Sequence, residues 1–98
     1  MEPRIGRKVP RPFSLHWGKG EIVEEATCVG EYHQPALQLL EYEDGTHSVR
    51  FCYYNHAGRF QRGPLILGPD DVVELRESLE DAPRLRSFLA ELLDVRAP

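Results

Sequence analysis

The sequence predicts an α+β domain, in which a twisted antiparallel sheet of about five strands is followed by two C-terminal helices. Apolar residues alternate with polar ones over the first two thirds of the chain, between glycine-containing turns. The last third instead has apolar residues at helical spacing. With 98 residues, the chain has room for one core of modest size. We expect residues 1–12 to form a flexible basic arm and residues 13–98 to form a single domain.

Two strands are expected at the start of the domain. Phe13, Leu15 and Trp17 alternate with polar residues, which predicts a strand, and Gly18-Lys19-Gly20 predicts a turn after it. Residues 21–29 follow as a second strand, although their alternation is impure. Trp17 is expected to anchor the core, with stacking on a nucleic-acid base as the alternative use of its ring.

The third and fourth strands are expected at residues 36–42 and 46–55, joined by the turn Glu43-Asp44-Gly45. In the fourth strand we expect the odd positions, Val49, Phe51 and Tyr53, to face the core. The even positions then face solvent, because successive side chains of a strand point to opposite sides. This interpretation places Ser48, Arg50, Cys52 and Tyr54 on one exposed surface.

A hairpin turn at Asn55-His56-Ala57-Gly58 is expected to lead into a fifth strand over residues 59–67. The first helix begins near Pro69, because proline suits the first helical position and Asp70 and Asp71 suit the positive end of the helix dipole. Pro83 ends or kinks this helix and can begin a second one.

The second helix has a broader apolar face than a small sheet easily covers. A partner chain could bury that face, so we expect a homodimer whose interface contains Leu85, Phe88, Leu89 and Leu92. The alternative is a protein-interaction or regulatory module that uses the same face to bind a different protein.

Charge is segregated along the chain. The formal net charge is −4, yet residues 21–45 hold seven acidic and no basic side chains, whereas residues 46–68 hold three arginines and no carboxylate. Local patches direct binding more than the total charge does. The acidic side chains are expected to face solvent: Glu21, Glu24, Glu25, Glu31, Glu41, Glu43 and Asp44.

The arginines of residues 46–68 alternate with aromatic residues. Arginines that contact phosphates, beside rings on which bases stack, are typical of surfaces that bind single-stranded nucleic acid. The predicted contact residues are Arg50, Tyr54, Arg59, Phe60 and Arg62. The predicted function is therefore non-catalytic binding of single-stranded DNA or RNA, in the manner of a transcription or replication accessory factor.

Catalytic motifs are absent from the sequence. There is no Ser-His-Asp signature, phosphate-binding glycine loop or His-Glu-x-x-His motif. Cys28, His33, Cys52 and His56 are residue types that bind zinc, but their spacing matches no common zinc module. We therefore expect no enzyme, cofactor or metal.

No apolar run approaches the roughly 18–20 residues of a membrane span. The basic, proline-rich N-terminus also lacks the apolar stretch of a secretory signal. Two cysteines are too few for a disulfide framework and are expected to be buried or half-buried thiols. These features predict a cytoplasmic protein that does not bind membranes.

Residues 36–80 resemble the positive-cofactor-four family of transcriptional coactivators and its bacterial relatives. In that family a basic, aromatic sheet leads through a Lys-Gly-Ile-x-Leu segment into a helix that opens near a Pro-Glu pair. Leu65 and Leu67 match the apolar positions, and Pro69-Asp70 matches the helix opening. Gly63 and Pro64 stand where the family has Lys and Gly. The resemblance implies a dimer that binds single-stranded or melted DNA through its sheet, with the helix at the dimer interface, and it favours DNA over RNA.

Overall fold

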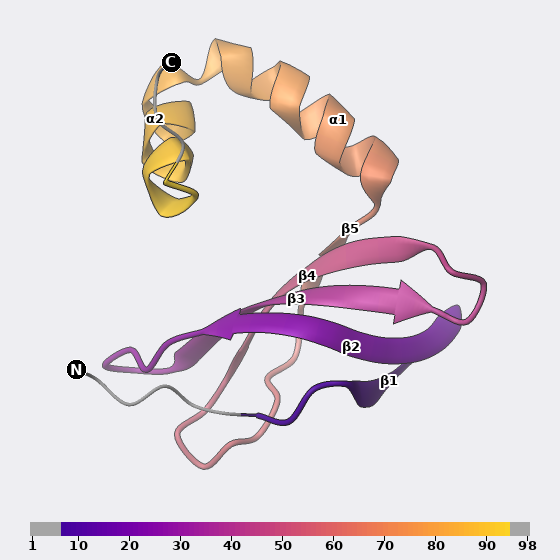
Figure 1. The fold of residues 1–98 in the computed structure, drawn as a ribbon. Helices are drawn as coiled ribbons and strands as arrows, with labels where there is room; N and C mark the ends of the chain where they lie inside the picture. The colour runs from indigo at the N-terminus through magenta and orange to yellow at the C-terminus, as the bar shows by residue number, and fades with distance from the viewer. Residues whose placement is uncertain (1–6, 95–98) are drawn as a thin grey trace. The chain divides into compact units, whose positions relative to one another are not determined.

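The computed structural model describes residues 7–94, and the chain divides into two units, residues 1–68 and residues 69–98. The first unit contains a five-stranded antiparallel sheet, and the second contains the helices (Figure 1). The predicted α+β class, with a sheet followed by two C-terminal helices, is confirmed. The part of the predicted arm that precedes residue 7 lies outside the described residues.

The five strands pair in sequence order. They are β1 (Arg11–Leu15), β2 (Gly18–Thr27), β3 (Gln34–Tyr42), β4 (His47–Tyr54) and β5 (Leu65–Leu67). The first turn falls at His16 and Trp17, earlier than predicted, because Gly18 and Gly20 belong to β2. The fifth strand is shorter than predicted, and Phe60 forms only an isolated bridge with Tyr54.

One face of the sheet, which we call the inner face, carries the apolar core. Phe13, Ile22 and Leu40 are buried there, and Ile66 from β5 packs against them. Gly20 lies between Phe13 and Tyr42 in the strand register, and these two rings meet edge to face with centroids 5.3 Å apart. A Cβ at Gly20 would lie 1.9 Å from the carbonyl oxygen of Glu41, so only glycine allows this close approach of β2 and β3.

A β-bulge interrupts β2. The pairing with β3 shifts between Ile22 and Glu24, which leaves Val23 as an extra residue. Ile22 pairs with Leu40 before the bulge, and Glu25 pairs with Gln38 after it, so Ile22 and Glu25 point to the same inner face despite their odd spacing. The bulge explains why the alternation of residues 21–29 is impure.

The predicted orientation of β4 is wrong. Its even positions Arg50, Cys52 and Tyr54 are buried on the inner face, whereas Phe51 and Tyr53 are exposed on the opposite, outer face. Since β3 and β4 pair in register, the even positions of β4 lie beside the buried even positions of β3, such as Gln38.

Two further burial predictions are also wrong. Trp17 does not anchor the core, because 59% of its surface is exposed and its ring contacts only that of His16 among the described aromatic residues. Cys28 is exposed, whereas Cys52 is buried as predicted.

The helical unit contains α1 (Pro69–Ser78), the short 3₁₀ helix η1 (Leu79–Asp81) and α2 (Pro83–Leu92). As predicted, α1 begins at Pro69 with two aspartates in its first turn, and α2 begins at Pro83. No residue of these three helices is buried. Within residues 7–94, no helix is long and apolar enough to span a membrane.

The orientation of β4 can be tested by labelling the two thiols. Cys28 is exposed, whereas burial raises the pKa of the Cys52 thiol despite the nearby charge of Arg50. In the folded protein we expect Cys52 to react with a thiol reagent at least about a hundredfold more slowly than Cys28, because its reaction requires local opening.

The variants Cys28→Ser and Cys52→Ser assign the two rates, and both thiols should react quickly in denaturant. Equal rates for the two cysteines in the folded protein would contradict the burial of the even positions of β4.

Candidate functional site

The predicted nucleic-acid-binding residues fall into two groups. Arg50 and Tyr54 are each only 7% exposed on the inner face, so their predicted place on an open surface is wrong. Arg59, Phe60 and Arg62 are exposed in the segment between β4 and β5. The structure therefore brings Arg50 and Tyr54 into a buried polar network and leaves the other three residues accessible.

Glu25 is the central carboxylate of this network. Arg11 donates to it through both terminal nitrogens, with Nη1 3.0 Å from Oε1 and Nη2 2.9 Å from Oε2. Gln38 adds a third hydrogen bond, from Nε2 to Oε2 at 2.6 Å. The Glu25 side chain is 5% exposed. The prediction that all of the acidic residues face solvent is therefore wrong for Glu25.

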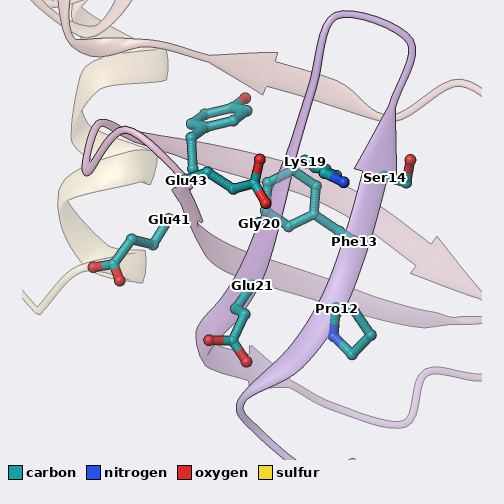
Figure 2. A pocket seen from close by; sticks show the side chains of 9 residues that line it. Pro12, Phe13, Ser14, Lys19, Gly20, Glu21, Glu41 and Glu43 are labelled. Carbon is teal, nitrogen blue, oxygen red and sulfur yellow. The ribbon is translucent and has the colours of Figure 1, made fainter.

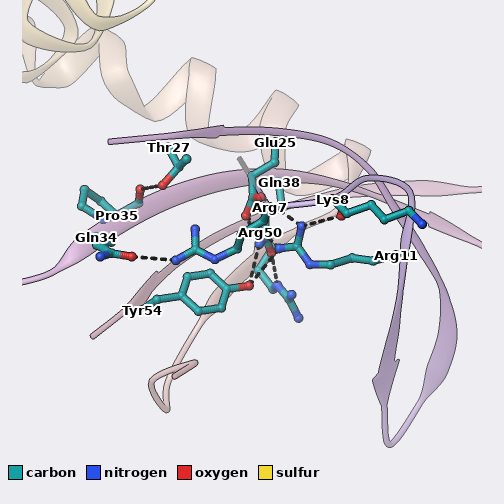
Figure 3. Close-up of polar contacts among 10 residues, drawn as sticks. All are labelled: Arg7, Lys8, Arg11, Glu25, Thr27, Gln34, Pro35, Gln38, Arg50 and Tyr54. Atoms are coloured by element: carbon teal, nitrogen blue, oxygen red, sulfur yellow. Dashed lines mark hydrogen bonds and ion pairs between the residues drawn. The ribbon is translucent and has the colours of Figure 1, made fainter. Parts of the chain in front are cut away.

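Gln38 and Tyr54 extend the network to β4. The Tyr54 hydroxyl accepts from Arg11 Nη2 at 3.1 Å and from Gln38 Nε2 at 3.0 Å (Figure 3). Arg50 Nε donates to Gln38 Oε1 at 2.7 Å. Side chains of β1 and β4, the first and fourth strands of the sheet, thus meet over the inner face.

The edge of the network is formed by Arg7. Its Nη2 donates to Gln34 Oε1 at 2.8 Å, and its Cζ lies 3.7 Å from the centre of the Tyr54 ring. Gln34 also approaches His56 Nδ1 at 3.4 Å, while His56 Nε2 lies 3.0 Å from the carbonyl oxygen of Glu31. In this arrangement His56 Nδ1 faces a donor and Nε2 faces an acceptor.

Burial by itself raises the pKa of Glu25. Hydrogen bonds from Arg11 and Gln38, together with the charges of Arg11 and Arg7, outweigh this effect and hold the pKa below its ordinary value of 4.5. The hydrogen bond to Glu25 in turn raises the pKa of Arg11. Glu25 is therefore ionised at neutral pH, and its charge stabilises the folded state.

The segment after β4 is shaped by Asn55. Its side-chain oxygen accepts from the backbone nitrogens of Ala57 at 3.0 Å and Arg59 at 2.9 Å. Gly58 donates to the Asn55 carbonyl at 2.9 Å with a φ of +84°, which confirms the predicted turn. The turn returns the chain so that the rings of Phe60 and Tyr54 meet edge to face, 5.4 Å apart.

We call residues 59–62 the arginine loop. Arg59 and Arg62 are exposed and form no ion pair with any residue in the described range 7–94. Between them, 42% of the surface of Phe60 is exposed, and the Arg50 guanidinium lies 4.8 Å from the centre of its ring. The loop therefore presents two unpaired cations and a ring to solvent.

A shallow hollow of about 710 Å³ lies beside β1, β2 and β3 and carries the opposite charge. Three carboxylates line it, and Lys19 is its one basic residue; the acids are Glu21, Glu41 and Glu43 (Figure 2). Oε2 of Glu41 lies 2.9 Å from Nε2 of His47. The hollow lies near His47, the first residue of β4, whereas the arginine loop follows Tyr54, the last residue of that strand.

Sequence reasoning missed Arg7, Arg11, Glu25, Gln34 and Gln38 as site residues. The sequence held one signal, the position of two glutamines on the apolar side of β3. Gln34 and Gln38 share that side with Leu40, and buried amides require polar partners. Their partners come from residues far away in the sequence, and the bulge in β2 conceals which side Glu25 faces.

The contribution of Glu25 can be measured by its pH dependence. A carboxylate whose folded-state pKa is depressed stabilises the protein above its unfolded-state pKa, and this stability is lost as the pH falls through the folded-state value. At neutral pH we expect Glu25→Gln to lower the free energy of unfolding by about 1.5–3 kcal/mol, the scale of hydrogen bonds to charged groups.

At pH values below the pKa of Glu25, the free energies of unfolding of the native protein and of Glu25→Gln should become equal. Denaturant unfolding across the acid range measures both. Glu24→Gln is the matched control, because Glu24 is adjacent but exposed on the outer face. A Glu25→Gln variant as stable as the native protein at neutral pH would rule out this role.

No family model, curated protein sequence or solved structure matches this chain. A function must therefore be inferred from the arrangement of its own side chains.

Proposed function

We propose that this protein binds single-stranded nucleic acid without catalysis, and that the contact surface is the arginine loop. The observation that carries the proposal is the exposure of Arg59 and Arg62, both without an ion pair within the described residues, on either side of an exposed Phe60. Guanidinium groups bind phosphate oxygens, and an exposed ring offers a face on which a base can stack.

The order of the loop supports this proposal. Hydrogen bonds from the Asn55 side chain stabilise the turn that precedes the loop. Within the loop, the backbone nitrogen of Gln61 donates to the Tyr53 carbonyl at 3.0 Å, and its Nε2 donates to the Arg59 carbonyl at 2.7 Å. A loop that is ordered before binding loses less entropy when the ligand binds.

The distribution of charge also supports it. The acidic hollow and the arginine loop lie beyond opposite ends of β4, roughly 20 Å apart along an eight-residue strand. The Debye length is about 10 Å at 0.1 M salt, so the carboxylates of the hollow do not cancel the positive field of the loop. A nucleic-acid strand is thus attracted to one end of the sheet and repelled from the other.

Single-stranded DNA is the form we propose first, because residues 36–80 resemble the positive-cofactor-four family. That resemblance also suggests a role as a transcription or replication accessory factor. Arg50 and Tyr54 do not belong to this contact surface, because they lie in the inner-face network and not on the arginine loop. Tyr54 in particular offers little ring surface to a base, since it is 7% exposed and Arg7 lies over one face of its ring.

The test is a titration of a fluorescent single-stranded oligonucleotide, followed by anisotropy at several salt concentrations. The double variant Arg59→Gln/Arg62→Gln should weaken binding and reduce the salt slope by about 1.4, because each of the two arginine–phosphate contacts contributes about 0.7 to that slope. Phe60→Leu keeps the apolar bulk but removes the ring, and it should weaken binding by about 1–3 kcal/mol, roughly five- to hundredfold.

Lys19→Gln is the matched control, because it removes an exposed cation from the acidic hollow. It should leave affinity unchanged or slightly weaker, because the cation that it removes is remote from the arginine loop. Unaltered affinity in the double variant, or binding that does not depend on salt, would refute the proposed surface.

The helical unit supports a second candidate function, in which α2 binds another chain. Leu85, Phe88 and Leu92 are more than half exposed, with Phe88 at 71%. The fourth predicted interface residue, Leu89, lines a mainly apolar hollow of about 480 Å³ together with Leu79, Ala90 and Leu93. Apolar surface of this kind marks association sites. The partner is either a second copy, as predicted from the sequence, or a different protein.

Self-association can be measured by light scattering of the full chain. If α2 forms the interface of a homodimer, Phe88→Ser should shift the native protein toward the monomer mass, because a large buried ring is typical of an interface hot spot. Arg84→Ser changes another exposed position of α2 and should leave the mass unchanged. A native protein that is monomeric at all concentrations would exclude the homodimer.

A further inference from the structure

The inner face holds more positive charge than its own carboxylate neutralises. Three guanidinium groups gather around Tyr54 and Gln38, those of Arg7, Arg11 and Arg50 (Figure 3). Glu25 is the one carboxylate among the residues that these contacts join. Because arginine stays protonated in proteins, the cluster carries a formal surplus of two positive charges.

The three guanidinium groups differ in how they are paired. Arg11 is fully engaged, since both of its terminal nitrogens bind Glu25. Arg50 is only 7% exposed, and its neighbours are uncharged: the Gln38 amide, the Phe60 ring and the Cys52 thiol. Arg50 is thus a nearly buried cation without a counter-charge.

Arg7 is half-buried and forms no ion pair with a described residue, although its charge acts on Glu25. Its Nη2 binds the neutral amide of Gln34, and its guanidinium lies against the Tyr54 ring. Its Nη1 has almost no exposed surface and no hydrogen-bond acceptor among the described residues. Amides and rings supply partial charges only, so they compensate a buried cation incompletely, and the unpaired ion keeps a large desolvation cost.

We propose that the inner face binds a phosphate group, held by Arg50 and Arg7 beside Tyr54. A phosphate monoester carries up to two negative charges near neutral pH, which equals the surplus of the cluster. Guanidinium groups also match phosphate geometry, because their parallel N–H bonds donate to pairs of oxygens. Arg11 and Glu25 fix the wall of this site and make no direct contact with the ligand.

This inference does not rest on the proposed nucleic-acid function. The arginine loop and the phosphate site share no residue, although Phe60 of the loop lies beside Arg50. The ligand is either a small phosphate compound or the terminal phosphate of an oligonucleotide, since both present the same group.

The first test uses inorganic phosphate alone and follows thermal unfolding. At about tenfold excess over its dissociation constant, phosphate should raise the melting temperature by roughly 5–10 °C, whereas chloride at the same ionic strength should not. Phosphorus NMR should show broadening of the phosphate signal by the native protein. An equal response to phosphate and chloride would overturn the proposal.

Variants then locate the site. Arg7→Ala removes a cation that precedes β1 and belongs to no strand, and it should abolish most of the phosphate response. Arg50→Gln should abolish it as well, with circular dichroism confirming that the sheet remains. Arg59→Ala, in the arginine loop, is the matched control and should retain the full response. A full response in Arg7→Ala would overturn the assignment.

The source of the phosphate is determined with two oligonucleotides that differ only in a terminal phosphate. Tighter binding of the phosphorylated one, lost in Arg7→Ala, assigns the site to a strand end, while equal affinities assign it to a small phosphate compound. The two proposals can fail separately. If the protein responds to inorganic phosphate but binds no oligonucleotide, only the nucleic-acid function proposed for the arginine loop is refuted. If it binds oligonucleotides but does not respond to inorganic phosphate, only the phosphate site is refuted.

Discussion

The buried ion pair between Glu25 and Arg11 is the interaction on which the inner face depends. Its two parallel hydrogen bonds join β1 to β2, and the same carboxylate accepts from Gln38 of β3. Tyr54 then joins β4 to both donors. Four strands are thus linked by one carboxylate and its immediate partners. Removing Glu25 would leave the half-buried Arg11 without its charge partner, which costs more than the pair itself contributes.

A polar centre of this kind specifies register more strictly than an apolar one. A slip of two residues between β1 and β2 would keep the apolar side chains on the inner face, whereas it would break the bidentate contact of Arg11 with Glu25. The bulge at Val23 belongs to the same arrangement, because it rotates the rest of β2 so that Glu25 points inward while Ile22 remains in the apolar core. The apolar cluster and the polar network therefore divide the inner face between them, and both require the same irregularity in β2.

The sequence predicts the local elements well and the orientation of β4 badly, for a physical reason. Turns at Asp44-Gly45 and Asn55-Gly58 and the helix starts at Pro69 and Pro83 depend on neighbouring residues, and all four are present. The orientation of β4 depends on distant partners. By hydrophobicity alone, Val49, Phe51 and Tyr53 are the better core candidates. Arg50 and Tyr54 are buried instead because Gln38 accepts from Arg50 Nε, and Arg11 and Gln38 donate to the Tyr54 hydroxyl. A local sequence pattern does not reveal such partners.

The positive charge of residues 46–68 consequently serves two purposes rather than one. Arg50 is drawn into the sheet, where it donates to Gln38 and lies over the Phe60 ring, while Arg59 and Arg62 remain in solvent. Phe60 is the residue that both groups share, because the Arg50 guanidinium lies over its ring while 42% of its surface is exposed. A buried cation beneath an exposed ring strengthens the field at that ring, since the surrounding dielectric is low. An anion near the arginine loop would therefore be attracted by the buried Arg50 as well as by the two exposed arginines.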